Sequence, residues 1–403
     1  MIIFDDHKAA CFYPLALNRS VGDLRCGILK LRQRLQQFLG DGEYQLWLEP
    51  RLQALYRERH PGWQINQASD PGSLFVNSRL MVTFEAVEAV EKLRANQCLQ
   101  RGDELIAFRA RDSFSSLPKL ADLKEAGFSL ISCELASYGN LSDLIHDNER
   151  LLRFDFEQFF YEQDNYFETE PGVTALNPYS IWIGENVELK PGVVLDASEG
   201  PIVLDEGVRV LPNAVIIGPA YIGRNSLIKV GAKIYPGSSI GPVCKIGGEV
   251  EGSIFQAFSN KQHDGFLGHS YVGEWVNIGA DTNNSDLKNT YGNVGFYSYA
   301  AKDKVDSGRM FLGALIADHV KLGINASLNT GCVVGIGCNL WGSDLIADFI
   351  PDFSWGRASE LSRHRFEAFC QTAGLVKQRR KLPFTAAERE LYQTLYAELE
   401  SSY

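Results

Sequence analysis

The chain has 403 residues, of which 45% are hydrophobic, and a formal net charge of −11 at pH 7. This length allows two or three domains, and the hydrophobic fraction excludes a generally disordered chain. The acidic balance argues against a nucleic-acid partner, and without an apolar run of membrane-spanning length we expect no membrane association. Eight single cysteines indicate reduced, buried thiols, and no signal peptide is evident, so the expected location is the cytoplasm.

The first part of the chain, residues 1–165, alternates strand-like and helix-like segments and predicts an α/β domain. The expected strands are 9–17, 44–48, 73–76 and 104–110, and the expected helices are 24–38, 82–95 and 142–160. A strand, a loop and a basic helix at the start of a domain can hold a phosphate at the helix N-terminus. An ordinary first βα unit has the same pattern, and the pattern alone favours that interpretation.

Residues 14–35 read PLALNRSVGDLRCGILKLRQRL. This segment resembles the opening of sugar-1-phosphate nucleotidyltransferases, in which an Arg and a Lys follow a glycine-rich loop. The resemblance implies nucleotide binding by Arg25 and Lys30. Non-glycine residues occupy the loop at 18–20, and Asn77 stands near the place of the family's metal-binding Asp. The implied domain is reduced: it binds a sugar nucleotide or stabilises the assembly, and it needs Mg²⁺ only if it turns over nucleotide.

The second part, residues 166–348, is organised by a repeat of six. Isoleucines recur at this spacing, and a small side chain stands two positions before each of them: Ile216, Ile222, Ile228, Ile234, Ile240 and Ile246. Only a fixed repeat of six keeps this register, and it predicts a parallel β-helix with three flat sides and about 18 residues per coil. The phase returns at Phe266, Val272 and Ile278, and again from Ile316 to Leu340. Residues 283–310 interrupt the repeat, which predicts a loop that projects from the coil, called the ejected loop below.

The last part, residues 349–403, is expected to be a helical extension, because the coil pattern ends after Gly342. A turn is expected at 351–356, and amphipathic helices at 362–372 and 386–399, the second capped by Thr385. A basic run between the helices contains Arg379 and Arg380; a solvated helix edge and a phosphate-binding site are both open interpretations.

Functional residues of a filled solenoid lie on its outside, between neighbouring coils or under an ejected loop. Residues 263–282 read HDGFLGHSYVGEWVNIGADT. They align without a gap with H-L-x-Y-L-G-D-A-x-I-G-x-x-V-N-I-G-A-G-T, the motif of hexapeptide-repeat acyltransferases in the GlmU family. This resemblance implies a left-handed coil, a homotrimer and acetyl-CoA as acyl donor. Phe266, His269 and Asp281 depart from the motif, which leaves the acyl acceptor open.

The resemblance implies that His263 is the general base, since a neutral imidazole can take a proton from an attacking amine or hydroxyl. His269 is the alternative base. The expected substrate contacts are Asn277, Lys288, Tyr291 and Lys261; the expected cofactor contacts are Thr330, Gly331, Arg379 and Arg380. A surface histidine and solvated lysines are the ordinary alternatives. No metal site is expected, because a zinc site at His263 would lack a fourth ligand. His319 is expected to face solvent.

The sequence therefore predicts an acetyl-CoA-dependent acyltransferase acting on an amino sugar phosphate or a nucleotide sugar. One alternative is a bifunctional enzyme that also forms a nucleotide sugar from a sugar 1-phosphate and a nucleoside triphosphate. Another is a non-catalytic trimeric scaffold that binds sugar nucleotide.

Overall fold

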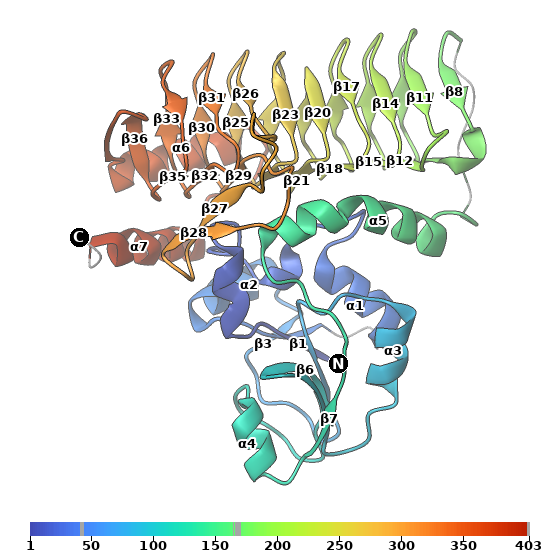
Figure 1. The fold of residues 1–403 in the computed structure, drawn as a ribbon, viewed down its shortest axis with the longest axis vertical. Helices are drawn as coiled ribbons and strands as arrows, with labels where there is room; N and C mark the ends of the chain where they lie inside the picture. The colour runs from blue at the N-terminus through green and yellow to red at the C-terminus, as the bar shows by residue number, and fades with distance from the viewer. Residues whose placement is uncertain (41–43, 164, 166–170, 401–403) are drawn as a thin grey trace.

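The computed structural model of the protein describes residues 1–40, 44–163, 165 and 171–400. An N-terminal α/β unit lies below a long three-sided coil in Figure 1, and two helices follow the coil at the C-terminus. Within these described residues, no helix combines the length and the apolar character that crossing a bilayer requires.

The N-terminal unit is built on a mixed sheet of seven strands in the order β3-β2-β1-β4-β6-β5-β7. Its strands are β1 (Ile2–Phe4), β2 (Gln45–Trp47), β3 (Gln64–Ile65), β4 (Leu74–Asn77), β5 (Gln97–Arg101), β6 (Glu104–Arg109) and β7 (Ser129–Ser132). β1 to β4 are parallel, and β6 pairs antiparallel with β4 and β5. The predicted strands at 44–48, 73–76 and 104–110 are confirmed.

The helices of this unit are α1 (Leu31–Leu39), α2 (Gln53–Arg59), α3 (Phe84–Glu91), α4 (Leu120–Glu125) and α5 (Leu141–Phe159), with 3₁₀ turns η1 (His7–Phe12), η2 (Val21–Asp23) and η3 (Pro50–Leu52). The strand predicted at 9–17 is wrong: the Asp6 side chain caps η1, and the apolar residues are buried in turns. The helix predicted from residue 24 begins only at Leu31, because Gly27 has a φ of 75° and reverses the chain.

The coil is a left-handed parallel β-helix with three sides. Side one holds β8 (Thr174–Leu176), β11 (Val194–Asp196), β14 (Val215–Ile217), β17 (Lys233–Ile234), β20 (Glu249–Glu251) and β23 (Phe266–Gly268), continued by β26 (Asn283–Asn284), β31 (Ser327–Leu328) and β34 (Leu345–Ile346). Side two holds β9 (Ile181–Ile183), β12 (Ile202–Leu204), β15 (Ala220–Ile222), β18 (Ser238–Ile240), β21 (Ile254–Phe255), β24 (Tyr271–Val272), β29 (Leu315–Ile316), β32 (Val333–Val334) and β35 (Phe349–Ile350). Side three holds β10 (Glu188–Leu189), β13 (Arg209–Val210), β16 (Leu227–Ile228), β19 (Lys245–Ile246), β22 (Asn260–Lys261), β25 (Asn277–Ile278), β30 (Lys321–Leu322), β33 (Asn339–Leu340) and β36 (Ser354–Arg357), with β37 (Glu360–Arg363) at its edge.

The predicted repeat builds the interior of the coil. Ile222 pairs with Ile240, eighteen residues along, and the six repeated isoleucines are at most 1% exposed. The small side chains two positions earlier are also buried, as predicted. Bulky side chains therefore stack on their counterparts in the next coil, and this stacking buries a continuous apolar core.

The six-residue repeat becomes irregular where a coil has fewer than eighteen residues. Ile240 pairs with Phe255 only fifteen residues along, and Val250 then pairs with Leu267 seventeen residues along. Because this coil has seventeen residues and not eighteen, the inward position of β23 moves by one residue, to Leu267. The prediction that Phe266 faces the interior is therefore wrong, because adjacent residues of a strand face opposite sides.

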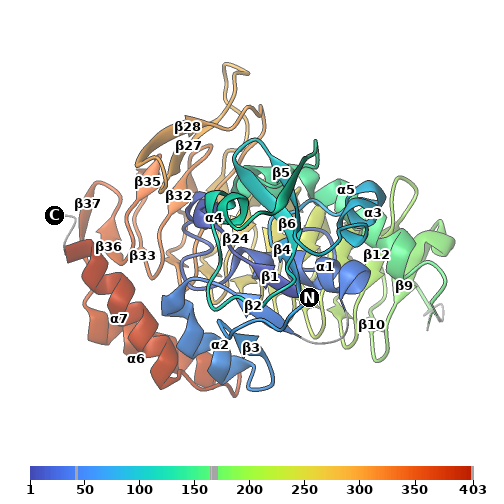
Figure 2. The same ribbon diagram turned by 90° about the horizontal axis from the view of Figure 1, so that it is seen from below.

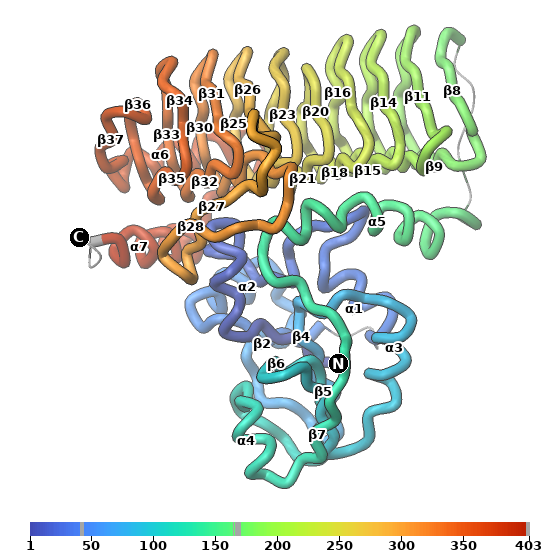
Figure 3. Tube along the Cα trace, in the orientation of Figure 1, coloured from blue at the N-terminus to red at the C-terminus, as the bar shows by residue number. Residues whose placement is uncertain are grey.

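The segment after β26 leaves the coil, as predicted for residues 283–310. It forms an antiparallel hairpin, β27 (Gly295–Ser298) and β28 (Asp303–Asp306), which reaches from the coil towards the N-terminal unit (Figure 3). Val294 and Phe296 of this ejected loop share an apolar cluster with Phe12 and Leu15 of the N-terminal unit. The loop therefore helps to join these two parts of the chain.

The coil ends later than predicted. β35 and β36 continue its second and third sides, so the end expected at Gly342 is wrong. The turn expected at 351–356 is present but shorter: it covers residues 352–353, and β36 begins at Ser354. Helices α6 (Phe366–Gln378) and α7 (Ala386–Glu400) follow. As predicted, Thr385 caps α7, because its hydroxyl accepts the Glu388 N–H.

The N-terminal unit and the C-terminal helices both pack on the coil. α5 runs beneath side two, where the Asn148 amide donates to the carbonyl of Gly237 (2.7 Å; Figure 1). α7 lies beside α2 (Figure 2), and the Arg59 guanidinium bonds the Glu388 carboxylate (2.7 Å). His319 is buried under α6 and α7, against Phe369 of α6 and Tyr392 of α7, so its predicted exposure is wrong.

Candidate functional site

His263 stands at the corner between sides three and one of the coil. Its side chain is exposed and lines a cavity of about 550 Å³. Residues from four successive coils form the walls: Lys229, Val230, Gly247, Gly248, Gln262, His263, Asp264, Ala280 and Asp281. The imidazole bonds no other side chain of the described chain and is free to meet a ligand.

Lys261 stabilises this corner through hydrogen bonds to backbone carbonyls inside the coil. Its side chain is 1% exposed, and its ammonium donates to the carbonyls of Gly247 (3.0 Å), His263 (3.3 Å) and Gly265 (2.5 Å). Burial lowers the pKa of Lys261 to about 8. The prediction that Lys261 contacts substrate is therefore corrected: its ammonium faces backbone carbonyls within the corner.

His269 lies at a different corner, between sides one and two, so the structure does not bring the two predicted bases together. Its Nδ1 lies 2.8 Å from a carboxylate oxygen of Asp286, which comes from the ejected loop. Phe311 and His146 of α5 provide neighbouring rings, at centroid distances of 5.2 Å and 6.4 Å. This group joins the coil, the ejected loop and α5.

The predicted contacts Asn277, Arg379 and Arg380 lie together in a separate cleft of about 380 Å³ on side three. The cleft runs between the coil and α6, and Gln262 lines both this cleft and the His263 cavity. Arg380 donates to the side-chain oxygen of Asn260 (3.0 Å). The basic run is therefore not simply a solvated helix edge.

The remaining predicted contacts in the acyltransferase half lie away from His263. Lys288 bonds the carbonyl of Asn293 within the ejected loop, and Tyr291 on the same loop is exposed. Gly331 lies so close to the Gly295 carbonyl that an added Cβ would stand 2.3 Å from it, and Thr330 beside it is 7% exposed. Gly331 therefore packs against the ejected loop, and cofactor contact by Thr330 and Gly331 stays a prediction.

The two predicted nucleotide contacts are engaged inside the protein. Arg25 is 5% exposed; its guanidinium bonds the carbonyl of Ile28 and lies over the ring of Tyr221 in the coil. Lys30 pairs with Asp23 (3.0 Å), and burial lowers the pKa of Lys30. Arg25 thus faces the coil and Lys30 has a carboxylate partner, and nucleotide contact by these two residues stays a prediction.

A different cavity of the N-terminal unit has the geometry of a ligand site. It measures about 320 Å³ and lies beyond the carboxyl ends of parallel strands β1, β2 and β3, where Asp5, Leu48 and Asn66 follow the strands. Trp47 adds a large aromatic surface. Burial raises the pKa of Asp5 to about 6, and Ser78 donates to its carboxylate (2.6 Å). Asn77, expected near the metal-binding position, is buried and donates to Asp6 (2.9 Å).

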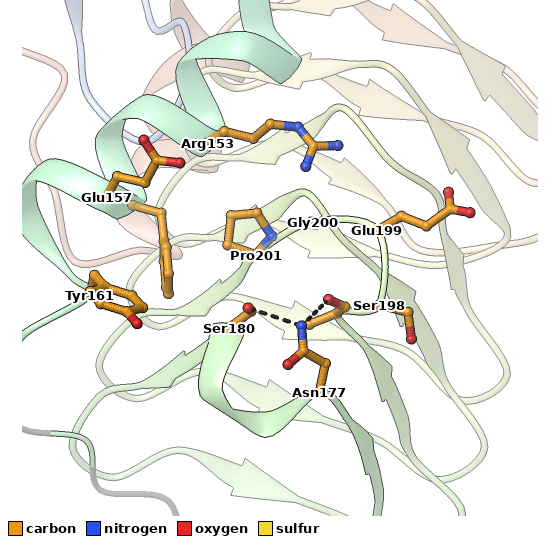
Figure 4. Close-up of a pocket in the computed structure, with 11 residues that line it drawn as sticks. Arg153, Glu157, Tyr161, Asn177, Ser180, Ser198, Glu199, Gly200 and Pro201 are labelled. Carbon is orange, nitrogen blue, oxygen red and sulfur yellow. Dashed lines mark hydrogen bonds between the residues drawn. The ribbon is translucent and has the colours of Figure 1, made fainter.

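A fourth cavity of about 300 Å³ lies between the end of α5 and the first coils (Figure 4). Arg153 and Glu157 face it from the helix, and Asn177 bonds Ser180 (3.0 Å) on its floor, in the turn η4 (Pro178–Ser180). None of the residues singled out from the sequence lines it. In the part of the chain that the structure describes, no group of three or more His, Cys, Asp or Glu side chains is placed to hold a metal ion.

Known proteins match different parts of the chain. Residues 1–163 match the family described as "Sugar nucleotidyl transferase". The bifunctional protein GlmU of Synechococcus elongatus is 27% identical over 249 residues, 54% of this chain and 55% of that protein. GlmU of Bartonella quintana is 25% identical over 206 residues (49% and 41%), and that of Methanococcus aeolicus is 34% identical over 161 residues (40% and 36%). The chain thus spans about half the length of the curated relatives that it matches.

Two solved structures of UDP-N-acetylglucosamine acyltransferases are similar at low identity. The enzyme from Bacteroides fragilis is 17% identical with a TM-score of 0.27, covering 51% of this chain and 78% of its own. The enzyme from Arabidopsis is 13% identical with a TM-score of 0.25, covering 53% and 80%. The chain is thus similar to sugar nucleotidyl transferases over residues 1–163 and to GlmU proteins over about half of its length.

Proposed function

We propose that the protein is an acyltransferase that moves an acetyl group from acetyl-CoA to an amino sugar phosphate or a nucleotide sugar, with His263 as general base. One observation carries the proposal. His263 is exposed on the wall of a cavity of about 550 Å³, and its imidazole bonds no other side chain among the described residues; the Lys261 ammonium bonds the backbone of this corner from within. A base must reach the proton that it removes, and this histidine has an open path to a ligand.

In the proposed reaction, a ring nitrogen of His263 accepts a proton from the acceptor amine as the amine nitrogen attacks the thioester carbonyl carbon. The carbon–sulfur bond then breaks, and the coenzyme A thiolate takes the proton from the imidazolium. Asp264 and Asp281 line the same cavity. Their carboxylates favour an acceptor that carries an amine and hydroxyl groups, because both are hydrogen-bond donors.

A homotrimer is part of this proposal. The His263 corner carries exposed apolar side chains in other coils, Val230 (60% exposed) and Ile324 (67%), and Leu345 (55%) lies nearby on side one. A row of exposed apolar side chains along a solenoid supports packing against a second copy. Such packing would close the open side of the His263 cavity. Light scattering of the purified protein tests this assembly.

The test of the transferase is thiol release from acetyl-CoA with a panel of amino sugars, their 1-phosphates and nucleotide sugars. We expect acceptor-dependent release by the wild type and a loss of at least a hundredfold for His263→Ala. His7→Ala, which changes an exposed histidine of the N-terminal unit, is the matched control. Absence of release with every acceptor from a folded protein would favour a non-catalytic scaffold instead.

A second candidate function, nucleotide binding by the N-terminal unit, is supported by the cavity beyond β1, β2 and β3. Open parallel sheets bind ligands at such edges. Among the described residues, Asp5 is the single acidic side chain lining this cavity, and the Ser78 hydroxyl and the Val21 N–H already donate to it. This donor set does not fit Mg²⁺, and we derive no nucleotidyl transfer step. Titration with a nucleoside triphosphate, with and without Mg²⁺, tests the binding and would expose metal dependence.

A further inference from the structure

The first two coils and the end of α5 enclose the cavity shown in Figure 4. It measures about 300 Å³, within the size range of small-molecule sites, and it lies at the corner between sides one and two. The His263 cavity opens at a different corner and in later coils, and among the described residues the two cavities share no lining residue. A ligand bound here would therefore not occupy the proposed acyl transfer site.

Tyr161, just after α5, places an aromatic ring at one side of this cavity (Figure 4). Its ring stands edge-on against Phe156 of α5, at a centroid distance of 6.2 Å and an interplanar angle of 72°, and its backbone N–H bonds the Phe156 carbonyl (3.0 Å). Phe156 is 5% exposed and Tyr161 is 65% exposed, so a buried ring positions an exposed one. In the described part of the chain no other ring contacts Tyr161. The ring is therefore open for an apolar ligand face to pack on it.

Hydrogen-bond donors come from the helix and from the floor of the cavity. The Arg153 guanidinium bonds Glu149 through one amino group (2.9 Å), and its other amino group lies close to Gly200, where an added Cβ would stand 3.0 Å from it. Ser180 accepts a hydrogen bond from the Asn177 amide (3.0 Å), so its own hydroxyl hydrogen can be donated to a ligand. The helix and the floor thus each keep a donor for a bound molecule.

Two carboxylates at the rim of the cavity supply acceptors. Glu157 of α5 and Glu199, between β11 and β12, are exposed, and no described residue pairs with either of them. Because Arg153 shares its charge with Glu149, the local charge balance is negative, which disfavours phosphate and other anions. A hydroxyl group both donates and accepts hydrogen bonds. A ligand rich in hydroxyl groups therefore satisfies the donors and the acceptors of this cavity together.

We propose that this cavity binds a pyranose sugar without a phosphate group, with one face of the sugar ring on Tyr161 and its hydroxyl groups between Arg153, Ser180 and the two carboxylates. The C–H groups on one face of a pyranose pack on an aromatic ring, because the face of that ring carries negative charge. Hydrogen bonds to guanidinium and carboxylate groups are stronger than bonds between neutral groups. Two sources share this chemistry: a free sugar and a sugar unit of a glycan chain. The assignment does not depend on the acyl transfer proposed above.

The test is titration of the full chain with the methyl glycosides of glucose, galactose, mannose and N-acetylglucosamine, followed by saturation-transfer NMR. We expect at least one glycoside to bind with a dissociation constant on the order of 1 mM. Tyr161→Ala should weaken this binding roughly fivefold or more, because the sugar loses its aromatic surface. Tyr179→Ala is the matched control: this tyrosine of η4 is 88% exposed and does not line the cavity, so its loss should leave the affinity unchanged. An oligosaccharide of the preferred sugar that binds more tightly than the methyl glycoside identifies a glycan chain as the source, and one that binds no more tightly identifies a free sugar.

His263→Ala should bind the glycoside like the wild type, and Tyr161→Ala should release thiol like the wild type, so failure of the proposed function and failure of this inference are distinguishable. Wild-type affinity in Tyr161→Ala would overturn the proposal, because the sugar would then lie elsewhere, such as at His263. No binding of any glycoside by the wild type would overturn it as well. Glucose 1-phosphate should show no binding that depends on Tyr161; such binding, if tighter than that of methyl glucoside, would contradict a site that disfavours phosphate.

Discussion

The buried ammonium group of Lys261 donates a hydrogen bond to the backbone carbonyl of His263, two residues along the chain. The same ammonium bonds Gly247 in the preceding coil and Gly265 on the far side of the histidine. Three carbonyls from two coils are thereby drawn to one cation. The exposed imidazole consequently stands on a corner whose backbone is fixed from within, which is the support that a reacting side chain requires.

Replacing Lys261 with methionine tests this relationship. The variant keeps the length of the side chain and removes the donor, so the buried carbonyls lose their partner. We expect the free energy of unfolding to fall by about 1–3 kcal/mol, and thiol release to fall at least tenfold as His263 loses its fixed position. Urea unfolding and the acetyl-CoA assay measure the two effects. Lys190→Met in an early coil is the control, and wild-type turnover by Lys261→Met would refute the positioning role.

His269 and Asp286 provide the test of which histidine is the base. We expect Asp286→Asn to lower the free energy of unfolding by about 1 kcal/mol, because it weakens the 2.8 Å contact that ties the ejected loop to the coil. Thiol release should stay within threefold of the wild type. A loss of transfer in Asp286→Asn as large as that in His263→Ala would instead identify His269 as the base, since an Asp partner orients a catalytic imidazole.

The coil could be predicted from the sequence because each isoleucine of the repeat has the same surroundings in every turn. The prediction failed at Phe266, where shortened coils move the inward position to Leu267. The coil period also contained a signal that sequence reasoning missed. Asp286 lies seventeen residues after His269, about one coil, and residues one coil apart are neighbours.

Contacts between the three parts of the chain could not be predicted in this way. His319 lies at a regular corner position, and nothing in the repeat indicates that α6 and α7 cover it. Arg380 reaches Asn260, which is 120 residues away.

The burial of His319 predicts acid sensitivity of the C-terminal helices. Burial, together with the charges of Lys321 and Lys377, holds the pKa of His319 well below its usual value near 6.5. Below pH 6.5 the unfolded chain therefore binds a proton that the folded chain does not, and stability falls as the pH falls. His319→Phe should show a smaller loss of unfolding free energy between pH 7.5 and 5.5 than the wild type. An identical loss in both proteins would contradict this assignment.

The raised pKa of Asp5 predicts that the free energy of unfolding depends on pH in the opposite direction. Burial raises the pKa of its carboxyl from 3.8 to about 6, so between these values the folded chain binds a proton that the unfolded chain has released. The free energy of unfolding then falls as the pH rises through this window, by about 3 kcal/mol for this group, since each pKa unit corresponds to about 1.4 kcal/mol. Asp5→Asn removes the charge, and we expect it to be more stable relative to the wild type at pH 8 than at pH 4.5. Asp112→Asn, at an exposed site, is the control; equal differences at the two pH values would show that Asp5 ionises normally in the folded protein.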